Sequence, residues 1–322
     1  MNVICWGNFD NNKTHTISAE FHFNYWPRVG YKRKDKKPYL DIGVKISNYE
    51  NLNELVFWFS KEFEKFNIKN NFQDLGKCIS DNRTASLVFN EVLTTSTNAQ
   101  KAKQTIVTIT KSGETFIIYE LSEDNIEIKQ EFSGLTLHIT LTQLLSKEIK
   151  TPIYIRFRLK GNFLKEIERK IIVKNKLLQS AFTETSYIDF RFNDIRSCNS
   201  SLQEHLGNNN VIEIEKVHFL LMAHSDEEVS ASEPITARIL ETNAWESYLG
   251  NKIDHVCVAY HWRFASSNQS SCIIYGRYKV LHCNGWTILL YIAILFILTI
   301  IMNLTSSILY QNLHTWFPII FK

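Results

Sequence analysis

Apolar and polar residues alternate with a period of two along much of the first 280 residues. The clearest runs cover residues 17–25, 40–46, 135–141 and 153–159. This alternation is typical of strands that bury one face in an antiparallel sheet. In the stretch TIVTITKSGETFIIYEL, Ser112 and Gly113 separate two β-branched runs, which predicts a hairpin.

The second half of the chain continues the same pattern. Strands are expected at residues 187–193, 211–223, 255–265 and 272–281. The last two are joined by the polar stretch SSNQSS, so we expect them to form a hairpin that leads into the tail.

Helices are expected at few places. In NLNELVFWFSKEFEKF (residues 51–66) the apolar positions follow helical spacing, although aromatic residues also suit a strand there. Further helices are expected over residues 164–178 and 245–249. The pattern predicts a mainly β (α+β) fold, an antiparallel β-sandwich-like body with few helices. A soft boundary near SKEIKTP divides this body into β-rich domains at 1–149 and 150–283.

The tail has a different character. No Asp, Glu, Lys or Arg stands between Lys279 and Lys322. Eleven Ile, Leu and Phe residues lie within 288–302, and together they favour insertion into a bilayer by roughly 5 kcal/mol. We therefore expect a transmembrane helix over 284–306 rather than the buried core helix of a soluble domain. Its membrane-spanning residues include Trp286, Ile288, Leu290, Ile294, Phe296, Leu298 and Ile301.

Residues 307–322 are more polar, and Pro318 argues against a helix that continues to the end. Tyr310, Trp316 and Phe317 suit the membrane interface, so we expect an interfacial tail, with a second membrane segment as the alternative.

Flanking charge predicts the orientation. Lys252, Arg263, Arg277 and Lys279 precede the span, and Lys322 alone follows it. By the positive-inside rule, we expect the N-terminal body to lie in the cytoplasm. The protein would then be tail-anchored in the cell membrane. The first residues show no secretory signal pattern, and the six cysteines show neither disulfide nor zinc-site spacing.

Catalytic motifs are not evident. The sequence has no P-loop, HExxH, GxSxG or GxGxxG, so we expect no enzyme activity, catalytic residue, cofactor or bound metal. The alternative is a membrane-bound metal-dependent nuclease that uses Glu127 and Lys129, which share one strand face next to Asp124. His218 and His224 flank one strand and His255 and His261 another, and we expect them to be polar-face or core residues.

Positive charge gathers in two places. Arg156, Arg158 and Lys160 alternate with apolar residues, which predicts a row of cations on an exposed strand face. A second cluster stands in an expected loop and contains Lys32, Arg33, Lys34, Lys36 and Lys37. Both are candidate sites for an anionic partner such as lipid, nucleic acid or nucleotide, against the alternative of ordinary solvated surface.

These features favour a membrane-anchored sensor or interaction protein that contacts the lipid bilayer and a protein partner or a second copy of itself. The Asn-, Lys- and Ile-rich composition suits a microbial source. By analogy with single-span proteins that carry a large sensor body, the chain is a candidate membrane-disrupting effector of an antiviral defence system.

Overall fold

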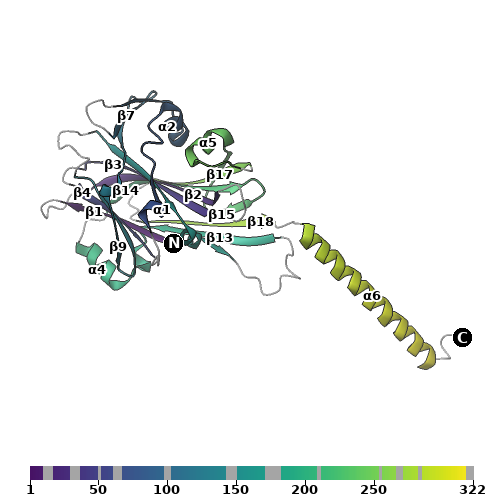
Figure 1. Cartoon of the computed structure of the whole chain (residues 1–322). Coiled ribbons are helices and arrows are strands. Elements are labelled where there is room, and N and C mark those ends of the chain that lie inside the picture. Colours follow the sequence, from purple (N-terminus) through teal and green to yellow (C-terminus); the bar gives the residue numbers. More distant parts are fainter. Residues whose placement is uncertain are drawn as a thin grey trace. The chain divides into compact units, whose positions relative to one another are not determined.

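The body is built from two mixed, mainly antiparallel β-sheets (Figure 1). This computed structural model describes residues 1–9, 17–29, 37–49, 52–60, 67–97, 103–142, 151–170, 183–208, 212–253, 256–265, 271–281 and 285–316. Within these ranges the mainly β fold with few helices and one long apolar C-terminal helix, as expected from the sequence, is confirmed.

The first sheet has eight strands in the order β15-β18-β13-β1-β4-β10-β9, with β12 beside β13. Their bounds are β15 Glu228–Ala231, β18 Cys272–Leu281, β13 Thr183–Phe192, β1 Asn2–Phe9, β4 Leu52–Phe59, β10 Gly134–Thr140, β9 Ile126–Glu131 and β12 Glu168–Lys170. β1 and β13 run parallel, whereas β1–β4, β4–β10, β9–β10 and β12–β13 are antiparallel.

The second sheet has ten strands in the order β16-β17-β14-β2-β3-β11-β8-β7-β6, with β5 beside β11. Their bounds are β16 Thr236–Ile239, β17 Cys257–Ala265, β14 Glu213–His224, β2 Ser18–Val29, β3 Lys37–Ser47, β11 Ile153–Lys160, β8 Thr115–Tyr119, β7 Gln104–Ile109, β6 Leu93–Thr97 and β5 Phe72–Asp74. The expected hairpin around Ser112 and Gly113 is present as β7 and β8.

Aromatic rings join the two sheets into a sandwich. Phe21 of β2 lies 4.5 Å from Phe192 of β13, measured between ring centroids, and Phe57 of β4 lies 5.6 Å from Phe157 of β11. All four side chains are fully buried. Burial of such large apolar surfaces is the main force that holds two sheets face to face.

Short helices cover the outer faces of both sheets. On the first sheet, α4 (Ser200–Asn208) places Leu202 and Leu206 against Trp6 and Trp58. On the second sheet, α2 (Asn82–Phe89) and α5 (Thr242–Leu249) contact each other and pack over the strands (Figure 1). Among the described residues, the other short helices of the body are α1 (Ile68–Asn71), η1 (Glu123–Asn125), η2 (Asn162–Ile167) and η3 (Ile195–Ser197). Together, α2, α4 and α5 cover part of the outer face of each sheet.

The helix expected over residues 51–66 is wrong where the structure describes it, because β4 occupies Leu52–Phe59. Phe57 points to the core between the sheets, whereas Val56 and Trp58 pack under α4. Because apolar residues occupy both faces of this strand, the period-two alternation is lost, and the sequence suits a buried helix as well as a strand.

Two further expectations need correction. β17 and β18 lie in different sheets, so they do not form a hairpin with each other. A short connection between two alternating strands can join neighbours in one sheet or cross from one sheet to the other, and both arrangements bury the same apolar faces. The helix expected over 164–178 is replaced by η2 and β12 as far as residue 170, and its remainder lies outside the described residues. The helix expected at 245–249 is present as α5.

The expected boundary near residue 149 does not separate the strands. Each sheet takes strands from both sides of it, and residues 1–171 and 185–278 form one compact unit. Cys5, Cys78, Cys198 and Cys272 are free thiols.

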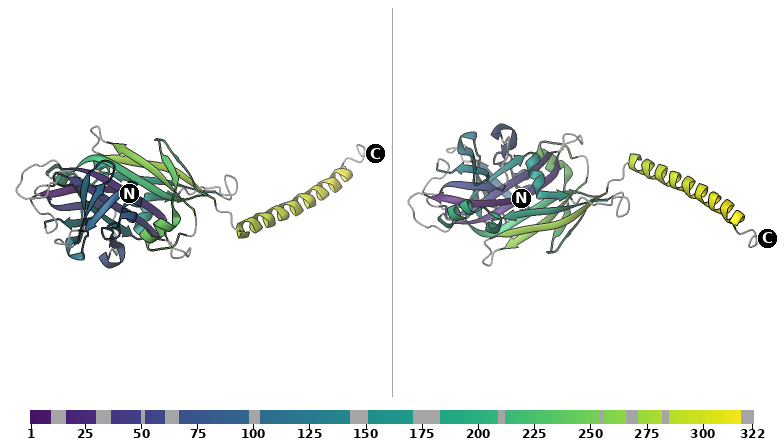
Figure 2. Two further views of the ribbon diagram at one scale, coloured as in Figure 1. Left: turned by 90° about the horizontal axis from the view of Figure 1, so that it is seen from above. Right: turned by 90° about the horizontal axis from the view of Figure 1, so that it is seen from below.

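α6 (Gly285–Trp316) is a single unbroken helix in every view (Figures 1 and 2). Its stretch Ile288–Asn312 is 25 residues long, apolar, and not buried against any other described residue. Among the described residues, this is the one helix with the length and composition to cross a membrane, which makes it a candidate membrane anchor. The helix continues through residues 307–316, part of the segment expected to lie at the interface, and residues 317–322 lie outside the described ranges.

Candidate functional site

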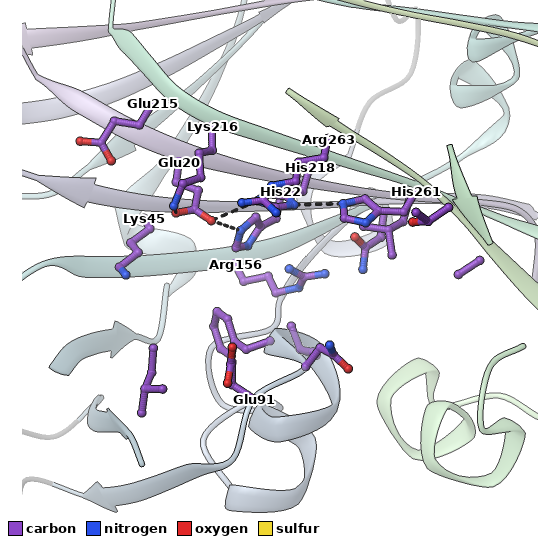
Figure 3. Close-up of a pocket in the computed structure, with 18 of the residues that line it drawn as sticks. Glu20, His22, Lys45, Glu91, Arg156, Glu215, Lys216, His218, His261 and Arg263 are labelled. Carbon is purple, nitrogen blue, oxygen red and sulfur yellow. Dashed lines mark hydrogen bonds and ion pairs between the residues drawn. The ribbon is translucent and has the colours of Figure 1, made fainter. Parts of the chain in front are cut away.

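A polar cavity of about 740 Å³ lies on the outer face of the second sheet, between β2, β3, β11, β14 and β17 and the segment around α2 (Figure 3). Its size is within the range of small-molecule sites. The ionisable side chains that line it are Glu20, His22, Lys45, Glu91, Glu114, Arg156, Glu215, Lys216, His218, Arg238, His261 and Arg263.

Strand register brings the central residues together. His22 of β2 pairs with Gly43 of β3 on one side and with His218 of β14 on the other. Gly43 in turn pairs with Arg156 of β11. Because Phe21 and Phe23 of β2 face the core, their even-numbered neighbours Glu20, His22 and Asn24 face outward into the cavity.

The carboxylate of Glu20 is the centre of a histidine cluster. Its Oε1 lies 3.1 Å from Nε2 of His22 and 3.3 Å from Nε2 of His218. Nδ1 of His218 lies 3.0 Å from Nε2 of His261, and Nδ1 of His22 lies 3.1 Å from Oη of Tyr154. Figure 3 shows the Glu20 carboxylate beside the histidine rings, with His261 at the end of the row.

The protonation of this cluster follows from its geometry. Burial acts to raise the pKa of Glu20, but hydrogen bonds from His218 and His22 outweigh it and hold the pKa well below its ordinary value. Burial lowers the pKa of His22 to about 4, and burial likewise lowers the pKa of His261 to about 4. At neutral pH, His22 and His261 are therefore uncharged beside an ionised Glu20.

An ionised carboxylate can only accept hydrogen bonds, so Nε2 of both His22 and His218 donates to Glu20. His22 is neutral, so its Nδ1 is then an acceptor. It accepts from Tyr154 Oη, and Nδ1 of His218 shares a hydrogen bond with Nε2 of His261. The result is a set of donors that converges on one carboxylate.

Arg156 is 1 % exposed and lines the same cavity. Its Nε donates to Tyr248 Oη at 2.8 Å and its Nη1 donates to Tyr154 Oη at 2.8 Å. Its Nη2 donates to the side-chain oxygen of Asn24 at 2.8 Å, with the Asn24 amide turned so that its oxygen faces the guanidinium. All three partners are neutral, and three of the five N–H groups of the guanidinium are used.

The neighbouring buried charge is already paired. Arg158 and Asp41 are both fully buried, and Nε of Arg158 donates to Oδ1 of Asp41 at 2.5 Å while Nη2 donates to Oδ2 at 3.0 Å. Tyr248 donates to the same Oδ2 at 2.8 Å and so connects Arg156 to this pair. The group of Arg156, Arg158 and Asp41 therefore buries a net charge of one positive unit.

Gly43 makes room for this arrangement. A Cβ at this position would collide with Oη of Tyr154 and come within 3.0 Å of Nη1 of Arg156. Glycine is thus required where the Tyr154 hydroxyl crosses the β3 backbone.

Gly43→Ala is expected to lower the free energy of unfolding by about 1–3 kcal/mol, because a methyl group would be forced into a filled space. Denaturant unfolding measures the change. Gly207→Ala is the matched control, since a Cβ there meets no atom within 4 Å and a helical Gly-to-Ala change is neutral or stabilising. An unfolding free energy for Gly43→Ala equal to that of Gly207→Ala would contradict the assignment.

The exposed cationic row expected from residues 156–160 is wrong at two of its three positions. Arg156 and Arg158 are buried, because the segment that contains α5 covers this face of the sheet and brings Tyr248 onto both guanidinium groups. Lys160 is half-buried, with its ammonium 5.4 Å from the ring centroid of Tyr39. Alternation had indicated which face the cations share, but not that a helix would pack on that face.

The other predicted residues lie apart from the cavity. Lys37 is exposed at the start of β3, and Lys32, Arg33, Lys34 and Lys36 lie outside the described residues. The membrane-spanning residues of the tail all lie in α6. His224 contacts Asp226 near the end of β14, and His255 is outside the described residues.

Glu127 and Lys129, the alternative nuclease residues, form an ion pair of 3.0 Å on β9. Both side chains are substantially exposed, and neither lines the cavity. The same face of the first sheet carries His138, whose Nδ1 lies 3.2 Å from Glu54 and whose Nε2 lies 3.6 Å from Glu131.

Sequence reasoning missed Glu20, His22 and Tyr154 as site residues. A sequence signal existed in β2, where Glu20, His22 and Asn24 alternate with apolar residues and must share one face. What joins them to His218 is the parallel pairing of β2 with β14, which spans almost 200 residues of chain.

Comparison with known proteins leaves the family open. No protein-family model matches the chain, and no curated protein matches it. Among solved structures, it is similar to the acetylcholine-binding protein type 1 of Biomphalaria glabrata, with 6 % identity, a TM-score of 0.17, and coverage of 80 % of this chain and 91 % of that one. It is also similar to the acetylcholine-binding protein of Capitella teleta in complex with lobeline, with 6 % identity, a TM-score of 0.15, and coverage of 84 % and 85 %. Similarity at this level carries no argument about fold or function.

Proposed function

We propose that this chain is a membrane-anchored binding protein whose β-sandwich body holds a small anionic ligand in the cavity of the second sheet. The observation that carries the proposal is Arg156. It is buried at the cavity, is bound by neutral partners among the described residues, and belongs to a group with one excess positive charge.

Burying an uncompensated charge is unfavourable, and a bound anion would remove that penalty. Two N–H groups of Arg156 remain for it after the three bonds described above. A guanidinium binds carboxylate or phosphate oxygens with two parallel hydrogen bonds, so the ligand would carry one of these groups. Nucleotides are among the molecules that meet this requirement.

α6 supplies the second half of the proposal. A 25-residue apolar stretch with no buried residue is long enough to cross a bilayer. The excess of Lys and Arg before the span supports a cytoplasmic body and a location in the cell membrane. A sensor would pass the occupied state of the cavity on to a protein partner or to a second copy of the chain.

Anion binding is tested with the full chain in mild detergent. Isothermal titration calorimetry with inorganic phosphate, pyrophosphate and ADP should show one ligand per chain for at least one of these probes. Arg156→Gln should weaken that binding by about 10–100-fold, the usual worth of hydrogen bonds to a charged group. Arg156→Lys keeps the charge but loses the planar guanidinium. Its affinity for the anion should lie between those of the unchanged chain and of Arg156→Gln.

Arg196→Gln is the matched control, because Arg196 is an arginine with a mostly exposed side chain, paired with Asp194 outside the cavity. Circular dichroism of each variant checks folding. Equal affinity of Arg156→Gln and the unchanged chain, or no binding of any of the three probes, would overturn the proposal.

The effector role in antiviral defence and the nuclease alternative at Glu127 and Lys129 remain predictions. The described geometry favours neither: the effector role has no structural feature behind it, and the Glu127–Lys129 pair is a solvent-exposed ion pair.

A further inference from the structure

We propose that Glu20, His22 and His218 form a binding site for one divalent transition-metal ion, with Zn²⁺ as the best match. Two imidazoles and one carboxylate make up a ligand set that proteins use for zinc and for other first-row ions such as Fe²⁺. The inference deepens the proposed function, because the ion would sit in the same cavity, and it rests on that cavity being a binding site.

The distances fit such an ion. One candidate ligand atom from each of the three residues lies within 4.8 Å of the other two. Bonds of about 2.0–2.1 Å at a tetrahedral angle place two ligand atoms about 3.3 Å apart. The separations from Glu20 Oε1 to Nε2 of His22 and of His218 are 3.1 and 3.3 Å. The two pairs are thus already at the spacing that a shared ion requires.

Each imidazole also has an outer partner. Zinc-bound histidines almost always place their second ring nitrogen on a hydrogen-bonding group, which fixes the ring and its tautomer. Here Nδ1 of His218 faces Nε2 of His261, and Nδ1 of His22 faces the hydroxyl of Tyr154. This support is the feature that distinguishes the cluster from a chance meeting of three polar side chains.

Metal binding requires the lone pair of Nε2 on each ring to face the ion. In the metal-free state Nε2 of His22 and of His218 carries the proton that Glu20 accepts. In the bound state each neutral ring carries its proton on Nδ1, and the lone pair of Nε2 forms the bond to the ion. Nδ1 of His218 would donate to His261, which can accept in its other neutral tautomer.

Three protein ligands leave a coordination position open toward the cavity, as in zinc sites that bind a further ligand. The ammonium of Lys216 would repel the ion, because its Nζ lies 3.5 Å from Oε2 of Glu20 and already places a positive charge there. That charge contacts the second carboxylate oxygen, so Oε1 remains for the ion. The site is therefore expected to gain affinity when this ammonium is removed.

The test uses the full chain in detergent after treatment with a chelator. Zn²⁺ titration in competition with a chromophoric chelator, with metal analysis after dialysis, should show one ion per chain, and Mg²⁺ should not bind. Co²⁺ in place of Zn²⁺ should give the visible absorption bands of a low-coordinate site. His22→Gln, His218→Gln and Glu20→Gln should each abolish binding.

Two graded variants sharpen the result. His261→Gln should weaken Zn²⁺ binding by about 10–100-fold, the usual effect of removing an outer-shell partner. Lys216→Gln should strengthen it. His224→Gln is the matched control, since it changes a histidine beside a carboxylate on the same strand, about 20 Å further along β14, and should leave affinity unchanged.

Absence of stoichiometric Zn²⁺ from the folded chain, or binding that survives His218→Gln, would overturn the metal site and leave the cluster as a hydrogen-bonded network. These outcomes are independent of anion binding measured without metal, so the two proposals can fail separately.

Discussion

Asp41→Ala is expected to lower the free energy of unfolding by about 3–5 kcal/mol, because it leaves a buried charge without its partner. Asp41 is fully buried and accepts hydrogen bonds from Arg158, Tyr248 and Trp26. Without it, the positive charges of Arg158 and Arg156 would face each other in the interior. Urea unfolding of the full chain in detergent measures the loss.

Two further variants test the cause. Glu127→Ala removes the exposed partner of Lys129 and should change the unfolding free energy by less than about 1 kcal/mol. The double variant Asp41→Leu/Arg158→Met replaces the buried pair with apolar side chains. Its unfolding free energy should decrease by less than that of Asp41→Ala. If Asp41→Ala were no more destabilising than Glu127→Ala, the pair would not support the fold as described.

The same pair makes stability depend on acid pH. Burial acts to raise the pKa of Asp41, but the charge of Arg158 outweighs it and holds the pKa below its ordinary value. A carboxyl group whose pKa is lowered in the folded state contributes stability above its unfolded pKa of about 3.9 and loses it as the pH falls through the folded pKa. Below about pH 4 the unfolding free energy should therefore decrease as Asp41 becomes protonated. The decrease should be smaller in Asp41→Asn, which has no carboxyl group at this position.

Removing residues 285–322 is expected to transfer the protein from the membrane fraction to the soluble fraction as a folded body. The body up to residue 278 has its own core, and the apolar side chains of α6 favour the bilayer by roughly 5 kcal/mol in sum. Ultracentrifugation of cell extracts, with circular dichroism of the released body, measures the change. A truncated chain that still sediments with membranes would contradict the anchor.

A single charge within the span gives a graded version of this experiment. Ile300→Arg should reduce membrane association, because an arginine at the centre of a span is unfavourable by about 2.5–3.5 kcal/mol. Ile300→Leu is the matched control and should have no effect. Protease added to vesicles of known orientation tests the proposed side of the body, which should be cleaved in inverted vesicles and protected in intact cells.

The sequence by itself determined the local elements of this protein wherever apolar and polar side chains alternate along the chain, even in β11, whose polar face is covered. The alternation in residues 17–25 and 153–159 predicted β2 and β11, and the uncharged run after Lys279 predicted α6. These features depend on neighbouring residues in the chain, so a short window contains them. β4 carries apolar side chains on both faces, so its sequence suited a helix as well as the strand that forms.

Tertiary structure alone decided which outward-facing polar residues meet and which are covered. His22 and His218 are adjacent because β2 and β14 pair in parallel with one register, and a shift by one residue would turn every second side chain into the core. Arg156 and Arg158 are buried because α5 packs on their strand. Asp41 of β3 pairs with Arg158 across the sheet and compensates its positive charge. Such pairings are set by the total burial of two large sheets and their covering helices. No local pattern carries that information, so the candidate site became visible only in the folded chain.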